Sequence, residues 1–492
     1  MTTSVETRTT YPHIMCQIPD IEYQNIIQCY NYRWEEKYVY LLHSILYPAL
    51  LKKNSFQNYT NLHSEILKRV LGEKYYRKVL NQLLNSDIIQ ALRDDNGREV
   101  YSRNAHSKAY RINPKYTTGT RIKAIPIHKQ TYCRKIAQLK EKNLLDAFKI
   151  NPLSQHEFLQ MTRRRIDVER ANMYIEQNYE NASPQFNARI VAVRNFNLMK
   201  DASFSQGKTK ISFDFIQNKG RIYTPATSLP RDLEQFTYFD GQYEDEHSVN
   251  IDMPNSQLCF FNELVKRESK KVQHIGTTDS EVYQENNKRP CNPEKSFKVA
   301  KHSPSILLPS INPYVLNFNT SWEDYIFNGL GYERMMFLCK WKGKEQGHSK
   351  DERQEFKAEF FGQLFYNKYS DAFTDMEQVF MTYHEPQAKA LREMKRVAGN
   401  RKRQRKRKKD GEWITYEGGS KLAVQVQDLE GRFFHTVIVG YMKANYIDVP
   451  FTIKHDSITM PKSCASYILP ELNTLVREFF QRNDIELKAD IL

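Results

Sequence analysis

The chain has 492 residues, enough for two to four domains or one elaborated core. Apolar residues make up 40% of it, with 30 Tyr and 27 Phe, which predicts a large buried interior and argues against wholesale disorder. The formal net charge of +15 indicates a polyanionic partner such as nucleic acid.

The seven cysteines are scattered and form no C-x-x-C pair, which disfavours a disulfide framework and a zinc ribbon. The sequence shows no apolar stretch typical of a signal peptide and no run of 18 apolar residues. We therefore expect a cytoplasmic protein with no membrane partner.

Residues 1–34 are predicted to form an irregular N-terminal segment. Residues 35–125 then predict a winged-helix-like domain, because three helices precede a hairpin around an Asn-Gly turn. The helices are expected at 38–51, 62–71 and 74–88, and the strands at 89–92 and 108–112. Winged helices bind nucleic acid in some proteins and other proteins elsewhere, and the sequence leaves both open.

Residues 126–205 are predicted to form a helical, thumb-like region. Its basic stretch, residues 161–170, suits either a helix that follows a phosphate backbone or a solvated face, and the solvated face is favoured. Strand patterns return in residues 206–265, where Gly220-Arg221 combines a flexible backbone position with a fork-shaped cation suited to phosphate.

Two aspartates are predicted at strand ends. A short strand ends at Asp252, with Asn255 or Ser256 capping the next helix, and His455-Asp456 is expected at the tip of a hairpin. If the two strands are neighbours, Asp252 and Asp456 converge. Converging carboxylates suit Mg²⁺, and two such ions activate a hydroxyl and stabilise a leaving pyrophosphate. A strand-end cap and an ordinary turn are the alternatives.

Residues 266–312 are predicted to be an insertion loop, and residues 313–394 to be helical, with a break at 328–331. On a helix from Asp351, four side chains share one face, with cations first and rings after them. Such a face suits a triphosphate and a base, although buried aromatics and a solvated cation face are the common alternative. These residues are Arg353, Lys357, Phe361 and Phe365.

Ten of the fifteen residues from 395 to 409 are cationic. Because such a block repels itself, we predict that residues 395–412 form a loop that contacts nucleic acid rather than a packed helix. A localisation signal or a solvated segment is the alternative. The residues expected to bind are Arg401, Lys402, Arg403 and Arg405.

Over about residues 210–480, these stretches resemble the superfamily of family A DNA polymerases and single-subunit, phage-type RNA polymerases. Residues 353–362 resemble motif B of the fingers helix, Asp252 with Ser256 resembles motif A, and residues 455–457 resemble motif C. Gly220-Arg221 resembles the template-contacting motif that ends in Gly-Arg. Their order and rough spacing agree as well.

The resemblance implies an α+β right-hand fold with an antiparallel palm sheet, formed by 206–265 and 413–492, and fingers formed by 313–394. It implies that Asp252 and Asp456, helped by the Met253 carbonyl, hold two Mg²⁺ or Mn²⁺ ions. It also implies that Arg353 and Lys357 hold the triphosphate, that Lys357 protonates pyrophosphate, and that Phe361 stacks on the incoming base. The nucleic-acid contacts would be Arg221, His455 and either Gln425 or Gln427.

Two positions bear on the sugar. Five residues after the motif A aspartate, the family's DNA polymerases carry a bulky Glu and its phage-type RNA polymerases a Gly, whereas this chain has Gln257. In motif B the usual Tyr is Phe365, which has no hydroxyl to recognise a ribose, with Tyr366 next to it. Both positions favour dNTPs.

The sequence thus predicts a DNA polymerase that extends a primer–template in the replication of a phage, plasmid or mobile element. An RNA polymerase or primase-polymerase is the alternative, favoured by Ser256 and Ser457. A catalytically inactive nucleic-acid-binding replication or defence protein is the third possibility.

Overall fold

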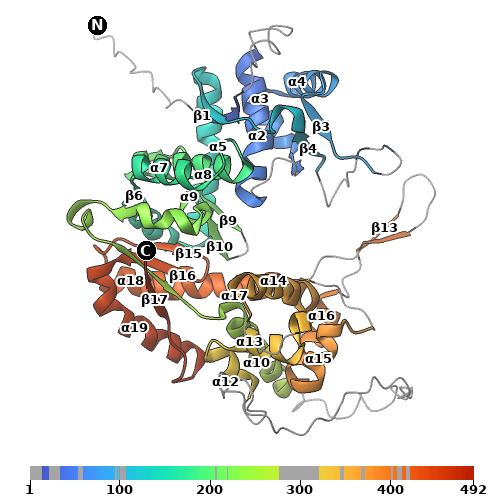
Figure 1. Ribbon diagram of the computed structural model, residues 1–492, viewed down its shortest axis with the longest axis vertical. Coiled ribbons are helices and arrows are strands. Elements are labelled where there is room, and N and C mark those ends of the chain that lie inside the picture. The colour runs from blue at the N-terminus through green and yellow to red at the C-terminus, as the bar shows by residue number, and fades with distance from the viewer. Residues whose placement is uncertain are drawn as a thin grey trace. The chain divides into compact units, whose positions relative to one another are not determined.

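The computed structural model shows an α+β protein in which all strand pairs among the described residues are antiparallel (Figure 1). It divides into two compact units. Unit 1 contains residues 1–252, 433–470 and 489–492, and unit 2 contains residues 253–432 and 471–488. The structure describes residues 14–20, 34–53, 59–94, 97, 99, 107–205, 208–218, 220–275, 321–343, 348–366, 372–399, 403–406, 413–416 and 421–492.

Unit 1 begins with the elements expected of a winged helix, and each predicted helix and strand is present. Helices α3 and α4 bury apolar side chains spaced three or four apart, and between them Gly72 adopts a φ of +90°. The three strands form a sheet in the order β2-β4-β3. The elements are α2 (Glu35–Lys53), β2 (Thr60–Asn61), α3 (Ser64–Leu71), α4 (Glu73–Asn85), β3 (Ile89–Ala91) and β4 (Ala109–Ile112).

The prediction of an irregular start was wrong for residues 14–19. They form β1 (Ile14–Pro19), which pairs along its whole length with β5 (Ile122–Ile127). Cys16 and Ile18 of β1 are fully buried in the core shared with α2. Pairing with a distant strand therefore sets the conformation of this segment.

The helical prediction for residues 126–205 holds for most of the segment. The helices are α5 (Gln130–Ile150), α6 (Ser154–Met161), α7 (Val168–Asn178) and α8 (Pro184–Asn197). The basic stretch, however, is not one continuous helix: between the end of α6 and the start of α7 it contains β6 (Arg164–Ile166), which pairs with β11 (Thr237–Phe239). Arg164 is 1% exposed and donates to the Thr237 hydroxyl at 2.8 Å, so this cation belongs to the interior.

Short strands and helical turns complete unit 1. Its main sheet has the order β15-β16-β12-β17, with strands that come from distant parts of the chain. The elements are β7 (Ser203–Ser205), β8 (Lys208–Lys210), β9 (Ile216–Asn218), β10 (Arg221–Tyr223), α9 (Pro225–Ser228), β12 (Ser248–Asp252), η8 (Phe433–Ile438), α18 (Val439–Asn445), β15 (Thr452–Lys454), β16 (Ser457–Pro461) and β17 (Lys488–Ile491).

Among the residues of unit 2 that the structure describes, helices predominate. The break predicted at 328–331 separates α12 from α13, whereas α10 extends well into the predicted insertion; the rest of that insertion lies outside the described residues. The elements are α10 (Ser256–Ile275), α12 (Trp322–Phe327), α13 (Gly331–Leu338), α14 (Lys350–Phe361), η7 (Gly362–Tyr366), α15 (Asp375–Tyr383), α16 (Glu385–Gly399), β13 (Arg403–Lys406), β14 (Trp413–Tyr416), α17 (Lys421–Arg432) and the end of α19 (Lys462–Phe480).

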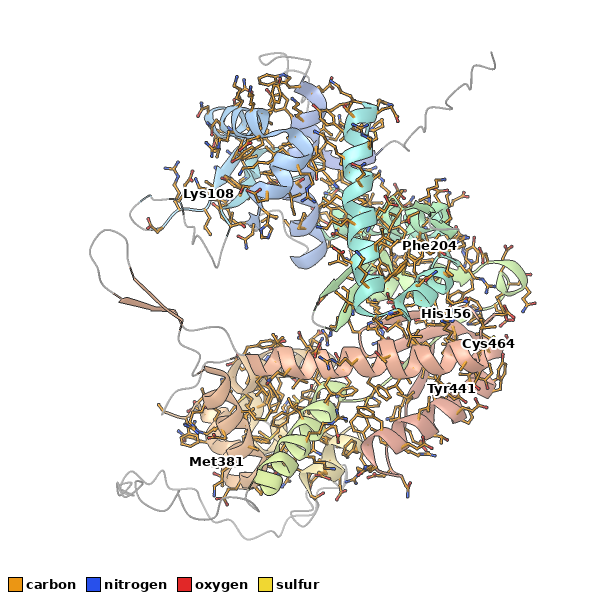
Figure 2. All side chains as sticks on the ribbon, turned by 180° about the vertical axis from the view of Figure 1, so that it is seen from behind. Lys108, His156, Phe204, Met381, Tyr441 and Cys464 are labelled. Atoms are coloured by element: carbon orange, nitrogen blue, oxygen red, sulfur yellow. The ribbon has the colours of Figure 1, made fainter. Side chains whose placement is uncertain are left out.

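No helix among the described residues is long and apolar enough to cross a membrane. The five cysteines that the structure describes are free thiols, and four of them are buried, including Cys464 on α19 (Figure 2).

Candidate functional site

The hairpin of β15 and β16 carries the predicted His455-Asp456 tip. Lys454 pairs with Ser457 across the hairpin, so the turn consists of His455 and Asp456 alone. His455 adopts a φ of +57°, in the left-handed region that residues other than Gly, Asn and Asp rarely occupy. The Ser457 hydroxyl donates to the Lys454 carbonyl at 3.1 Å and closes the turn. A strained, fixed turn thus presents Asp456.

Strand β12 lies beside β16, which is the arrangement that convergence of Asp252 and Asp456 requires. Asp252 pairs with Ser457, so Asp456 comes immediately before its cross-strand partner. Opposite residues in an antiparallel pair are about 5 Å apart at Cβ, so Asp252 lies directly across from Ser457, and Asp456, the residue before Ser457, lies at the same end of the two strands. Both side chains are only partly buried. They therefore remain accessible to ligands.

The residues at this edge fit a hydrated divalent ion. No group of three or more His, Cys, Asp or Glu side chains suited to a metal occurs in the described residues, so a cage made of protein ligands alone is not found there. Mg²⁺ usually takes one or two carboxylates and completes its shell with water and phosphate oxygens. Asp252 and Asp456 match that pattern. The Met253 thioether is buried, which leaves the main-chain carbonyl as the part of this residue suited to a hard ion.

A second hairpin, formed by β9 and β10, brings Arg221 toward the turn. Its Gly220 has a φ of +78°, a conformation that glycine adopts without strain. Tyr223, at the end of β10, packs its ring edge to face against the His455 ring, with 6.1 Å between the ring centroids. Arg221 also acts on His455 electrostatically. Three stretches that are distant in the sequence therefore meet in unit 1.

Burial controls the charge of His455. The pKa of the imidazole is lowered from 6.5 to about 4, first by burial and then by the positive charges of Arg221 and Lys454, while the charge of Asp456 acts in the opposite direction. The Nδ1 atom is buried and has no hydrogen-bond partner among the described residues. At neutral pH the ring is uncharged.

Buried ion pairs and hydrogen bonds connect the hairpin and its neighbouring elements. Glu157 of α6 and His435 of η8 lie 2.7 Å apart, each with 2% of its side chain exposed, and the Asn151 amide donates to the His435 carbonyl at 2.8 Å. Lys454 donates to the Leu229 carbonyl at 2.7 Å and pairs with a buried glutamate, Glu234. His156, labelled in Figure 2, is also buried and packs against Phe451. No local pattern in the sequence indicates these contacts.

In unit 2, α14 carries the predicted cations. Ser349 forms a capping box with Glu352: the Glu352 N–H donates to the Ser349 hydroxyl at 3.1 Å, and the Ser349 N–H donates to the Glu352 carboxylate at 2.9 Å. Arg353 and Lys357 both lie 5.4 Å from the centroid of the Tyr332 ring. Arg353 is ion-paired with Glu333, while Lys357 forms no ion pair with any described residue.

The aromatic part of this face differs from an uninterrupted helix. Phe361 and Phe365 are 7% and 2% exposed and pack against each other, so neither presents an open ring. The reason is η7, a π-helical segment from Gly362 to Tyr366. A π turn holds one residue more than an α turn, which shifts the exposed position from Phe365 to Tyr366. Tyr366 is 51% exposed, and its hydroxyl accepts from the Gln427 side chain at 3.2 Å.

The start of α10 contains a contact that sequence reasoning missed. The Ser256 hydroxyl donates to Glu430 of α17 at 2.7 Å, and Glu430 is fully buried. This bond fixes the first turn of α10, in which Gln257 is half-buried. Of the two candidate glutamines on α17, Gln425 is exposed, and Gln427 is the one bonded to Tyr366.

No family model matches this sequence, and no curated protein matches it either. Functional assignment therefore depends on the residues that the fold brings together.

The basic block is partly structured. Lys395 belongs to α16 and is buried, where its ammonium pairs with Glu377 at 2.7 Å and contacts the Gln363 carbonyl at 3.3 Å. The start of the predicted loop is therefore a helix with an internal ion pair. Arg403 and Arg405 lie on β13, which pairs with β14, while Arg401 and Lys402 lie outside the described residues.

Proposed function

We propose that the protein is a template-directed nucleotidyltransferase that extends a 3′-hydroxyl with nucleoside triphosphates. The observation that supports this most is the placement of Asp252 beside the Asp456 turn on neighbouring strands. Two carboxylates at one sheet edge form the ligand set that Mg²⁺-dependent phosphoryl transfer requires. The fold proposed for this chemistry is the right-hand polymerase, with the palm around the sheet of β12, β15 and β16.

The residues of unit 1 take the following roles in this proposal. Asp252 and Asp456 hold the divalent ions, which when bound supply activation of the hydroxyl and neutralisation of the leaving pyrophosphate. The hairpin of Gly220 and Arg221 holds the template backbone, because a guanidinium binds phosphate through two parallel hydrogen bonds. His455, uncharged at neutral pH, adds no positive charge next to Asp456.

The residues of unit 2 hold the triphosphate. Lys357 is ready for this role because its ammonium lies over the Tyr332 ring and is not ion-paired with a described carboxylate. It donates the proton that the leaving pyrophosphate needs. Arg353 binds phosphate by exchanging Glu333 for a phosphate oxygen. The base-stacking role expected for Phe361 passes to the exposed ring of Tyr366.

Two residues bear on the choice of sugar, and they favour different sugars. Gln257 is bulky at a position where a small residue would admit a 2′-hydroxyl, which favours dNTPs. Tyr366 replaces Phe365 as the exposed aromatic residue and carries a hydroxyl, which favours NTPs. DNA synthesis remains the proposed activity because the bulk of Gln257 excludes a 2′-hydroxyl without needing a hydrogen-bond partner. RNA synthesis or priming is the second candidate, supported by Tyr366.

A primer-extension panel tests the proposal. The full chain is incubated with Mg²⁺, DNA and RNA templates, and dNTPs or NTPs, with and without primer. We expect templated extension that Asp252→Asn or Asp456→Asn reduces by about 10²- to 10³-fold, since charge stabilisation by a fixed group is worth about 3–4 kcal/mol. Asp245→Asn is the matched control, because Asp245 is an exposed aspartate of the same unit.

The outcomes separate the candidates. Gln257→Gly should raise NTP incorporation relative to dNTP incorporation, and an unchanged ratio would contradict the role of Gln257. If extension is undetectable in every condition while nucleic-acid binding persists in both aspartate variants, the protein is a non-catalytic binding protein and the proposal fails.

A further inference from the structure

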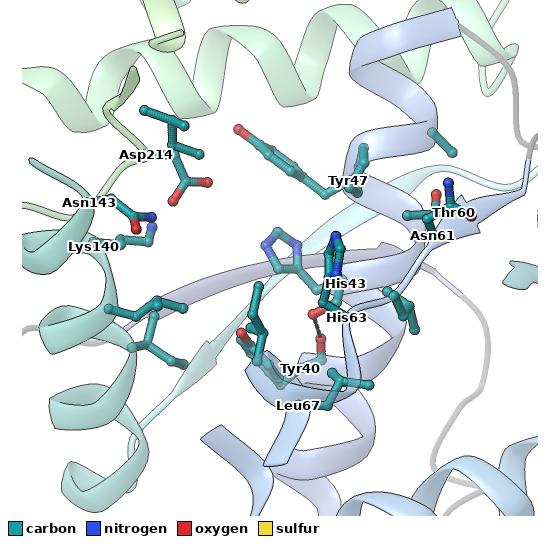
Figure 3. Close-up of a pocket in the computed structure, with 18 of the residues that line it drawn as sticks. Tyr40, His43, Tyr47, Thr60, Asn61, His63, Leu67, Lys140, Asn143 and Asp214 are labelled. Atoms are coloured by element: carbon teal, nitrogen blue, oxygen red, sulfur yellow. Dashed lines mark hydrogen bonds between the residues drawn. The ribbon is translucent and has the colours of Figure 1, made fainter. Parts of the chain in front are cut away.

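Unit 1 contains a cavity of about 560 Å³ between α2, β2, α5 and the segment before β9 (Figure 3). Its volume lies within the range of sites for nucleotide-sized ligands. Helix α2 contributes Tyr40, His43 and Tyr47, which are spaced three and four residues apart and so share one helix face. The facing wall provides Lys140, Asn143 and Asp214.

Asp214 gives the cavity its main acceptor. Its carboxylate forms no ion pair and no hydrogen bond with any described residue, yet its charge acts on Tyr40, His43 and Tyr47 together. In Figure 3 the Asp214 side chain faces the part of the cavity that Tyr47 lines. A carboxylate in this position accepts two hydrogen bonds from adjacent donors of a ligand.

His43 and Lys140 provide the hydrogen-bond donors of the cavity, which suit acceptor atoms of a ligand. The Gln17 N–H donates to His43 Nδ1 at 3.0 Å, so the proton of the neutral ring lies on Nε2. Burial and the nearby Lys140 charge lower the pKa of His43 to about 4, which keeps the ring neutral. Among the described residues, Nε2 has no hydrogen-bond acceptor. The Asn143 amide, which also lines the cavity, is similarly unpartnered there.

These groups select one nucleobase. Guanine presents two adjacent donors, N1–H and N2–H, which match a carboxylate, and next to them the acceptor O6, which matches an imidazole N–H or an ammonium. The Watson–Crick edges of adenine, cytosine and uracil or thymine offer no pair of adjacent N–H donors on neighbouring groups. The Tyr40 and Tyr47 rings line the same cavity, with the Tyr47 ring centroid 4.9 Å from that of His43, and an aromatic wall of this kind suits a planar base.

We propose that this cavity binds a guanine base, supplied by a free nucleotide or by an unpaired base of a nucleic-acid strand. The site is separate from the Asp252–Asp456 edge and does not depend on the proposed reaction. Asp214 comes two residues before β9, whose hairpin partner carries Arg221. A base bound at Asp214 therefore restrains the same hairpin.

Calorimetric titration of the full chain in EDTA tests the proposal, because monophosphates without divalent ions avoid the proposed triphosphate site. We expect GMP to bind at least tenfold more tightly than AMP, CMP or UMP. Asp214→Asn should weaken GMP at least tenfold and strengthen xanthosine monophosphate, because an amide matches the N1–H and O2 pair of xanthine. Asp245→Asn is the matched control and should leave both affinities unchanged.

Two oligonucleotides distinguish the sources of the base. If a dT strand with one central dG displaces GMP and a dT-only strand does not, the base comes from a strand. If GMP binds and neither strand displaces it, the ligand is a free nucleotide. Equal binding of all four monophosphates, or a loss of GMP affinity in Asp214→Asn with no gain for xanthosine monophosphate, would overturn the guanine assignment.

Discussion

Replacing His455 with Asn tests how strongly the stability of the His455–Asp456 turn is coupled to proton binding. Asn tolerates the φ of +57° that this position requires, so the hairpin is retained while the titratable ring is lost. In the folded chain the pKa of His455 is about 4, compared with 6.5 in the absence of the surrounding structure. The unfolded chain therefore binds the proton more readily between these two values.

The sign of the effect follows from this difference. The contribution of neutral His455 to stability is fully present above pH 6.5, decreases as the pH falls toward 4, and is lost below it. The full difference corresponds to about 3 kcal/mol. The wild-type chain should lose up to that amount between pH 6.5 and 4 relative to His455→Asn, which lacks this contribution to the slope.

Urea unfolding at several pH values between 4 and 7, followed by circular dichroism, measures the two slopes. Because the chain has two compact units, the transitions are fitted separately, and the comparison applies to the transition that His455→Asn alters. In Arg221→Gln, the free energy of unfolding should depend less steeply on pH than in the wild type, since Arg221 is the charge that lowers the pKa of His455 most. Equal slopes for the wild type and His455→Asn would refute the reasoning.

Two further substitutions test the packing around the candidate sites. Glu157→Leu leaves a buried His435 without its partner and should lower the free energy of unfolding by about 3–5 kcal/mol, whereas Glu157→Gln, which keeps a hydrogen-bonding group, should cost clearly less; equal losses would show that the pair matters only for its volume. In Gly331→Ala the new methyl would lie 2.8 Å from Ile326 Cγ2 and 2.9 Å from Leu258 Cδ1, which predicts a loss of about 1–3 kcal/mol by thermal unfolding and contradicts the packing if stability rises.

The features that the sequence predicted are those determined by local patterns. Helices α2, α3 and α4 follow from apolar spacing, and the turn at His455 and Asp456 follows from two β-rich arms around a polar pair. The neighbouring position of Asp252 was inferred from the motifs together rather than from any single one. The pairing of β12 with β16 agrees with that inference.

The features that the sequence did not predict depend on distant partners. The segment of residues 14–19 forms strand β1 because β5 pairs with it. Lys395 was predicted to begin a loop that contacts nucleic acid, whereas it is buried in α16 and ion-paired with Glu377. The bond between Glu157 and His435 joins residues 278 positions apart, which no local pattern encodes. Buried polar contacts of this kind need the three-dimensional arrangement to be seen.

The π turn from Gly362 to Tyr366 has a consequence for how this chain is compared with others. A π turn arises from an α-helix by the insertion of one residue, and removal of one residue restores the regular helix. Position counting along such a segment therefore pairs the wrong aromatic residues. A one-residue deletion between Gly362 and Tyr366 would place Tyr366 four residues after Phe361 on a regular helix, so the tyrosine hydroxyl would keep the exposed position although its number in the chain changes.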